Sequence, residues 1–361
     1  MMNAEITGWG KCMPPNVLTN HDLEQIIDTS DDWITTRTGI KERRISNVEA
    51  SDLAAVACLR ALAAAGKSAE DVDLLLVATC SGDSIIPSTA SRVQEKIGAV
   101  NAAAMDLNAA CSGFVYGLVT GANMIRGGTN KTVLLVGTEK LHHLMNFTDR
   151  TTCVLFGDGA GAVVLEPSED GVGVLGSELG IDGSAGKFLE VPADGTQGDW
   201  LARSPDQCAI RMDGQEVFRR AVTKMAESSL QALEKSDLGL EDVDILIPHQ
   251  ANVRIIDATA RRLGVDSSKV FVNIHSYGNT SAATIPVALT EALEQGQIEP
   301  GAIVAFTAFG GGLTWGSAIV RWGARVEPLA ESDAELPPVD RTTLEILQSN
   351  FDYFGVPEKL A

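Results

Sequence analysis

The chain has 361 residues, of which 45% are hydrophobic and 21% charged, and its formal net charge is −20. This length predicts about two domains of a globular protein, and neither a membrane span nor a secretory signal is visible, which favours a cytoplasmic protein. The negative charge argues against nonspecific binding to nucleic acid or to an anionic membrane, because both require a positive surface field.

A repeated segment organises the predicted elements. The sequence Glu-Asp-Val-Asp occurs at residues 70–73 and again at 241–244, 171 residues later, and both copies lead into a run of Leu, Ile and Val. Each copy follows a stretch with helical periodicity, residues 52–65 and 217–233, so each half predicts a helix, a turn and a buried strand. Strands that alternate with helices are typical of parallel sheets covered on both faces.

Further strands are predicted at residues 131–136 and 302–307, and the repeats divide near residues 167–173. We therefore expect two similar halves, residues 1–170 and 171–323.

Two segments break the symmetry. Residues 183–211 are rich in Gly, Asp and Ser and predict a long loop, which in a compact domain is usually functional or disordered. Residues 324–361 form an acidic C-terminal appendage, in which residues 342–354 predict a short amphipathic helix.

One of the six cysteines lies at a place suited to catalysis. The cysteines are scattered without CxxC pairs or metal-ligand spacing, so neither a disulfide framework nor a metal site is expected. Cys111 stands where a strand-like run gives way to a helical one. At the start of a helix, backbone N–H groups and the helix dipole favour the reactive thiolate. An isolated cysteine is more often a packing residue, so the argument depends on its partners.

Two candidate partners lie in the second half. His249 follows a buried strand, and open α/β sheets place ligand-facing groups at the carboxyl ends of their strands. Asn279 precedes a predicted helix and falls roughly opposite Cys111 in the repeat. A structural histidine and a helix N-cap remain the alternatives for these two residues. Their joint occurrence with Cys111 at related positions favours a shared cleft.

The chain resembles the β-ketoacyl-acyl-carrier-protein synthase III family of the thiolase-like superfamily. The resemblance extends from Ile6 to Trp322. It rests on six segments in order, residues 31–40, 106–114, 156–162, 249–252, 278–283 and 309–316. It implies an α/β thiolase-like fold of two similar halves, with mixed five-stranded sheets in a layered αβαβα arrangement.

The resemblance also implies a reaction. Cys111 accepts an acyl group from acyl-CoA, and the backbone N–H groups of Cys111 and Gly311 form the oxyanion hole. His249 and Asn279 then donate hydrogen bonds to the thioester oxygen of malonyl-acyl-carrier protein as CO2 departs. The product is a 3-ketoacyl-acyl-carrier protein, which starts fatty-acid or related polyketide synthesis. CoA and carrier-protein thioesters serve as substrates, and no separate cofactor or metal is implied.

Further residues are carried over as substrate contacts. The implied CoA-binding residues are Trp33, Arg37, Arg150, Gly214, Phe218 and Asn252. Among these, Trp33 and Arg150 are expected to sandwich the adenine. Ile86 and Leu141 are assigned to the acyl pocket. Family members that use acetyl primers often have Phe in place of Ile86, so the smaller side chain predicts a longer or branched acyl group.

Two kinds of partner are expected from the same resemblance. Arg254, Arg261 and Arg262 share a predicted helical face, and together with Arg219 they form a candidate patch for the acidic acyl carrier protein. The superfamily also implies a homodimer.

Two other functions share parts of this pattern. An iterative type III polyketide synthase also uses Cys, His and Asn, but the segments 278–283 and 309–316 argue against it. A noncatalytic subunit that binds acyl thioesters would usually have lost the nucleophile, so the presence of Cys111 argues against that reading.

Overall fold

The computed structural model describes residues 3–169, 171–192 and 203–357. Its first sheet contains, in spatial order, β1 (Asn3–Cys12), β7 (Gly159–Ser168), β6 (Val133–Glu139), β4 (Leu74–Ala78) and β5 (Ala103–Leu107). The strand β4 pairs in parallel with β5 and β6, whereas β7 runs antiparallel to β1 and β6. The first sheet is therefore mixed.

The second sheet repeats this order. It contains β8 (Gly173–Ile181), β13 (Thr314–Arg321), β12 (Ile303–Gly310) and β11 (Ile245–Pro248). A single parallel bridge between Leu246 and Val270 occupies the place of β5, so this sheet has four strands rather than the expected five. At this place the Gln250 amide donates to the Phe271 carbonyl and accepts the Asn273 N–H, both at 3.1 Å. In a longer strand, these backbone groups would instead form hydrogen bonds with the neighbouring strand.

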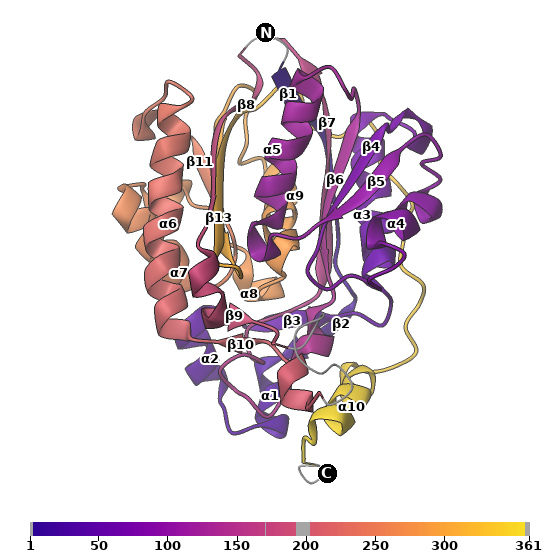
Figure 1. The fold of residues 1–361 in the computed structure, drawn as a ribbon, viewed down its shortest axis with the longest axis vertical. Coiled ribbons are helices and arrows are strands. Elements are labelled where there is room, and N and C mark those ends of the chain that lie inside the picture. Colours follow the sequence, from indigo (N-terminus) through magenta and orange to yellow (C-terminus); the bar gives the residue numbers. More distant parts are fainter. Residues whose placement is uncertain (1–2, 170, 193–202, 358–361) are drawn as a thin grey trace.

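Six helices complete five layers (Figure 1). They are α3 (Ala50–Ala65) and α4 (Thr89–Ile97) outside the first sheet, α5 (Gly113–Arg126) and α9 (Thr284–Glu294) between the sheets, and α6 (Gly214–Glu234) and α7 (Val253–Leu263) outside the second. The largest apolar core joins both sheets through α5 and α9, with Phe114 and Phe306 in edge-to-face contact at 6.2 Å. The expected αβαβα arrangement is confirmed.

Shorter elements gather at the lower end of Figure 1, beyond the carboxyl ends of the central parallel strands. They are β2 (Asn16–Thr19), α1 (Asn20–Ile26), α2 (Asp31–Thr38), β3 (Glu42–Ile45), β9 (Leu189–Glu190), β10 (Arg211–Met212) and α8 (Ile274–Tyr277). The described part of the expected long loop includes the ribbon β9–β10, paired through two residues of each strand. Residues 193–202 of that loop lie outside the described residues.

The C-terminal segment ends in α10 (Thr343–Phe354), which confirms the predicted amphipathic helix. A capping box at Thr342 starts the helix, and Leu347 is fully buried. The segment before α10 is tied to the N-terminal half, because Leu329 N–H donates to the Ala64 carbonyl at 3.0 Å and Arg60 donates to the Ala334 carbonyl at 3.1 Å. No helix in the described ranges is long and apolar enough to cross a membrane.

Candidate active site

Cys111 lies in a 3-10 turn, Ala110–Ser112, that leads from the end of β5 into α5. Ala110 takes the left-handed conformation with φ 47°, which is uncommon for a residue with a side chain. The turn places the Cys111 side chain at the junction of two cavities, and Cys111 lines both. A residue in this position can contact a substrate from either side.

The corresponding turn of the second half faces this one and corrects the alignment of the two halves. Ser281 has φ 48° and lies 171 residues after Ala110. The Asn108 side chain accepts the Ala110 N–H at 3.1 Å, and the Asn279 side chain accepts the Ser281 N–H at 2.8 Å. The structural counterpart of Asn279 is therefore Asn108, rather than Cys111 as the sequence alignment of the halves suggested.

His249 follows β11 and is held on two sides. Its backbone N–H donates to the Thr307 carbonyl at 2.8 Å, and its Nδ1 lies 2.7 Å from the Thr284 hydroxyl. Burial lowers the pKa of His249 to about 3, so the imidazole is neutral at physiological pH. With Nδ1 engaged by Thr284, Nε2 is the ring nitrogen available to a ligand.

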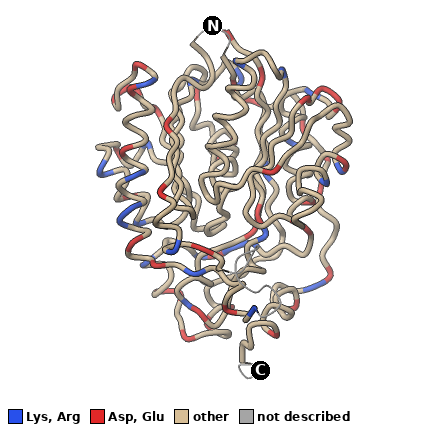
Figure 2. The backbone as a smooth tube through the Cα atoms, viewed as in Figure 1, with Lys and Arg blue, Asp and Glu red and all other residues tan. Residues whose placement is uncertain are grey.

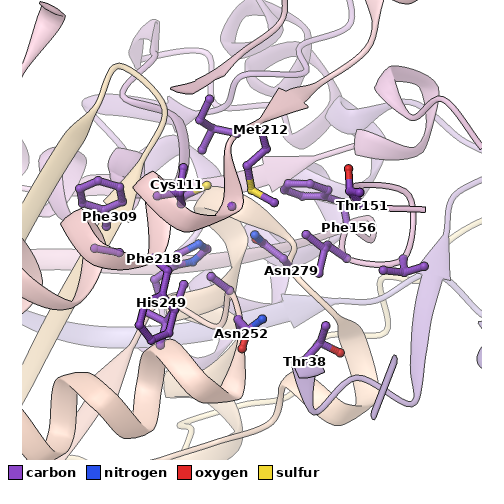
Figure 3. A pocket seen from close by; sticks show the side chains of 18 of the residues that line it. Thr38, Cys111, Thr151, Phe156, Met212, Phe218, His249, Asn252, Asn279 and Phe309 are labelled. Atoms are coloured by element: carbon purple, nitrogen blue, oxygen red, sulfur yellow. The ribbon is translucent and has the colours of Figure 1, made fainter. Parts of the chain in front are cut away.

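Asn279 completes a group of three polar side chains. Its Oδ1 is engaged by the Ser281 N–H, so its Nδ2 is the amide atom left to donate into the cavity. Cys111, His249 and Asn279 line one cavity, and Figure 3 shows their side chains pointing toward one another. The structure therefore brings together one residue from the first half and two from the second.

The Cys111 thiol is neutral in this environment. Burial raises the pKa of Cys111 to about 12, a hydrogen bond with Ser281 opposes this rise, and the charge of Glu139 adds to it. Desolvation therefore opposes the resting thiolate that the helix start is expected to favour.

Glu139 is a site residue that sequence reasoning missed. Its fully buried carboxylate accepts hydrogen bonds from the hydroxyls of Ser81 at 2.5 Å and Thr79 at 3.2 Å, and from the Cys80 N–H at 3.2 Å. It also lies 3.4 Å from the Ala282 N–H, next to Ser281. The sequence does indicate Glu139, because this residue lies at the carboxyl end of the parallel strand β6. His249 was predicted as a site residue from the same position relative to β11.

The first cavity extends outward from the three polar side chains. Four of the six expected CoA-binding residues line it, namely Trp33, Gly214, Phe218 and Asn252. Arg37 and Arg150 stand beside this cavity, with guanidinium carbons 4.7 and 5.2 Å from the centre of the Trp33 ring. An adenine stacked between Trp33 and Arg150 would therefore have to move Arg150 outward.

The second cavity lies on the other side of Cys111. Its walls include the expected acyl-pocket residue Leu141 and further apolar side chains, Leu144, Phe156, Leu189, Val191 and Ile210. Gly311 also lines it, just after β12. A Cβ on the preceding Gly310 would lie 2.6 Å from the Cys111 nitrogen, so this close approach requires glycine. Ile86 is 87% exposed and lines neither cavity.

The expected basic patch lies on the two helices outside the second sheet. Arg254, Arg261 and Arg262 are exposed along α7, and Arg219 is exposed on the neighbouring α6. Figure 2 shows that basic (blue) and acidic (red) positions are mixed along α6. Arg219 is paired with Glu216 at 2.7 Å, which reduces its free charge. Within the described ranges, no three His, Cys, Asp or Glu side chains gather to hold a metal ion.

A duplicated five-layer fold, with a cysteine from one half facing a histidine and an asparagine from the other, defines the thiolase-like class of condensing enzymes. Two family models match within it. The model described as 3-oxoacyl-[acyl-carrier-protein] synthase III matches residues 105–183, and the model of that enzyme's C-terminal part matches residues 233–322.

Individual relatives agree with these family models. A β-ketoacyl-[acyl-carrier-protein] synthase III 2 of Vibrio cholerae is 51% identical over 97% of both chains. A synthase III of Desulfitobacterium hafniense is 50% identical over 90% of this chain and 99% of its own. The crystal structure of the Aquifex aeolicus synthase III has a TM-score of 0.83 at 46% identity, covering 88% of this chain and all of that one. The chain belongs to the β-ketoacyl-acyl-carrier-protein synthase III family and is a condensing acyltransferase.

Proposed function

We propose that the chain joins an acyl group from acyl-CoA to the two-carbon unit of malonyl-acyl-carrier protein, with loss of CO2. The observation that carries this proposal is the position of Cys111 at the junction of two cavities. The first cavity contains the polar groups of His249 and Asn279 and leads outward past Trp33. The second contains the apolar side chains of Leu141, Leu144 and Ile210, which suit the tail of an acyl group.

In the first half-reaction, the Cys111 sulfur attacks the thioester carbon of acyl-CoA. The bond from that carbon to the CoA sulfur breaks, and the proton of the Cys111 thiol ends on the released CoA. The N–H groups of Cys111 and Gly311 receive the negative oxygen of the intermediate. Attack requires the thiolate, so deprotonation of the buried thiol accompanies this step.

In the second half-reaction, the bond between the malonyl carboxylate and its neighbouring carbon breaks and CO2 leaves. The resulting enolate oxygen accepts hydrogen bonds from His249 Nε2 and Asn279 Nδ2. The enolate carbon then attacks the acyl carbonyl, and the Cys111 sulfur departs as the thiolate, which takes up a proton from water to restore the resting thiol. A neutral imidazole suits this role because it can donate one hydrogen bond without supplying a proton to the carbanion.

The carrier protein, the homodimer and the cellular compartment belong to the same proposal. The arginines of α7 would receive the acidic carrier protein, because Asn252 at the start of that helix lines the first cavity. A homodimer is supported by the exposed edge strand β5 and by the 88% exposed Ile85 on a nearby loop. The free state of all six cysteines supports a reducing compartment such as the cytoplasm.

The first half-reaction can be tested by intact mass spectrometry after incubation with mixed acyl-CoAs. We expect the wild type to gain one acyl group and Cys111→Ala to gain none. Cys80→Ala is the matched control, because Cys80 lines the second cavity close to the same Ser281 hydroxyl. An adduct that persists in Cys111→Ala but disappears in Cys80→Ala would contradict the proposal.

A further inference from the structure

The C-terminal helix α10 packs against the fold at a specific place (Figure 1). The Asn350 side chain is buried and donates from Nδ2 to the His142 carbonyl at 2.9 Å. The Phe351 ring meets the buried Phe147 ring edge to face at 5.3 Å. Both contacts fall on residues 141–147, which we call the wall segment.

The opposite side of the wall segment faces the second cavity. Leu141 and Leu144 line that cavity beside Cys111. The Ile210 N–H donates to the Leu144 carbonyl at 2.9 Å, so a further lining residue is attached to the same segment. All three side chains and Leu347 of α10 belong to one apolar cluster. The buried side chains of α10 and those that line the second cavity thus pack in the same cluster.

A second connection joins α10 to the same wall. The helix α10 also contacts the short 3-10 helix Pro205–Cys208, two residues before Ile210. The helix α10 therefore contacts both the segment that carries Leu144 and the segment next to Ile210. Their positions relative to Cys111 depend on how α10 is seated.

This helix lies outside the part of the chain that the family models match. The C-terminal family model ends at residue 322. The Desulfitobacterium hafniense relative is matched over 99% of its own length but only 90% of this chain, whereas the Vibrio cholerae relative is matched over 97% of both. The common chemistry thus does not require the added segment, and a role in selecting substrates fits its contacts.

We propose that α10 is a specificity element, which sets the length of acyl group that Cys111 accepts by holding the wall segment against the second cavity. This inference rests on the proposed function, because it takes the second cavity as the acyl site. Without Asn350 and Phe351, Leu144 and Ile210 can retreat into the space that Phe351 leaves. Longer acyl groups then fit better, whereas an acetyl group, which does not reach the wall, is accepted as before.

The test uses the full chain and a ladder of acetyl-, butyryl-, hexanoyl- and octanoyl-CoA. The rate at which Cys111 gains each acyl group is followed by intact mass spectrometry in wild type and in Asn350→Ala/Phe351→Ala. We expect the ratio of the octanoyl to the acetyl transfer rate to rise about tenfold. This factor is the lower end of the change in selectivity that one misfitted methylene causes in an apolar pocket. The matched control is Gln348→Ala/Ser349→Ala on the exposed side of α10, which should keep the wild-type ratio.

The outcomes separate this inference from the proposed function. If the wild type gains no acyl group from any of the four thioesters, the proposed function fails. If the wild type is acylated but the double variant keeps the same ratio, or loses all four rates equally, α10 only stabilises the fold and the inference is overturned. If the double variant does not fold, Phe351→Leu retains an apolar side chain and must shift the ratio in the same direction.

Discussion

At the scale of single residues, one hydroxyl proton decides which ring nitrogen of His249 can donate to the substrate. The Thr284 hydroxyl lies 2.7 Å from His249 Nδ1 and 3.0 Å from the Ser281 carbonyl. Donation to Nδ1 leaves the imidazole proton on Nε2, where the enolate needs it. Donation to Ser281 would move that proton to Nδ1. The proposed reaction therefore requires the first arrangement, and Thr284 is a positioning residue.

Thr284→Val tests this requirement, because valine has the same shape but cannot donate. We expect acylation of Cys111 to keep its rate, while decarboxylation and condensation slow about 100-fold, as when one donor of an oxyanion site is lost. Single-turnover kinetics of each half-reaction provide the measurement, and Thr284→Ser should restore most of the rate. Equal slowing of both half-reactions would show that Thr284 only supports the fold.

Glu139 offers a second test at this scale. Its charge adds to the raised pKa of Cys111, so neutral Glu139→Gln should lower that pKa and shift alkylation by iodoacetamide to lower pH. Below the wild-type pKa the variant carries more thiolate, and its alkylation should be several-fold faster there. Glu139→Asp, which keeps the charge, is the control. Slower alkylation of Glu139→Gln across the whole pH range would contradict this assignment.

At the scale of elements, the repeat was the strongest signal in the sequence. The matching runs at residues 70–73 and 241–244 correctly predicted that β4 and β11 would occupy equivalent places in two sheets. The alignment of Cys111 with Asn279 was wrong by three positions. The two turns share backbone conformation at Ala110 and Ser281 but not residue type, so side-chain similarity could not fix their register.

Other parts of the site depend on contacts between distant segments. The sequence predicts a loop where the ribbon β9–β10 lies. Each strand has only two residues, too few for a strand pattern, and is defined by its pairing with the other strand. Leu189 and Met212 of this ribbon line the first cavity. Likewise, composition predicted α10 as a helix, but its partners Phe147 and His142 lie about 200 residues earlier and follow no local pattern.

The exposed arginines of α7 yield a prediction for the carrier protein. Arg262→Glu should raise the KM for malonyl-acyl-carrier protein several-fold, with less effect as salt increases, and should leave the KM for acyl-CoA unchanged. Lys131→Glu is the control, since this exposed lysine just before β6 makes the same change in net charge away from α7. An equal effect of both variants on the carrier protein would argue against a patch on α7.

At the scale of the whole molecule, Ile86 connects specificity with assembly. In one chain this side chain is exposed and contacts neither cavity, so an influence on acyl choice requires a second chain. We expect sedimentation to give the mass of a dimer. Ile86→Phe should then reduce use of octanoyl-CoA relative to acetyl-CoA. A monomer in solution, or a change in selectivity that persists at dilutions where the dimer dissociates, would contradict this account.

The most direct test of the central claim follows the enzyme's mass through one turnover. Wild-type enzyme is loaded with an acyl group, freed of CoA and mixed with malonyl-acyl-carrier protein. We predict that Cys111 loses its acyl group as the carrier gains it and CO2 is released. His249→Ala and Asn279→Ala should acquire the acyl group but retain it. Discharge of the acyl group at the wild-type rate in both variants would contradict the roles assigned to His249 and Asn279.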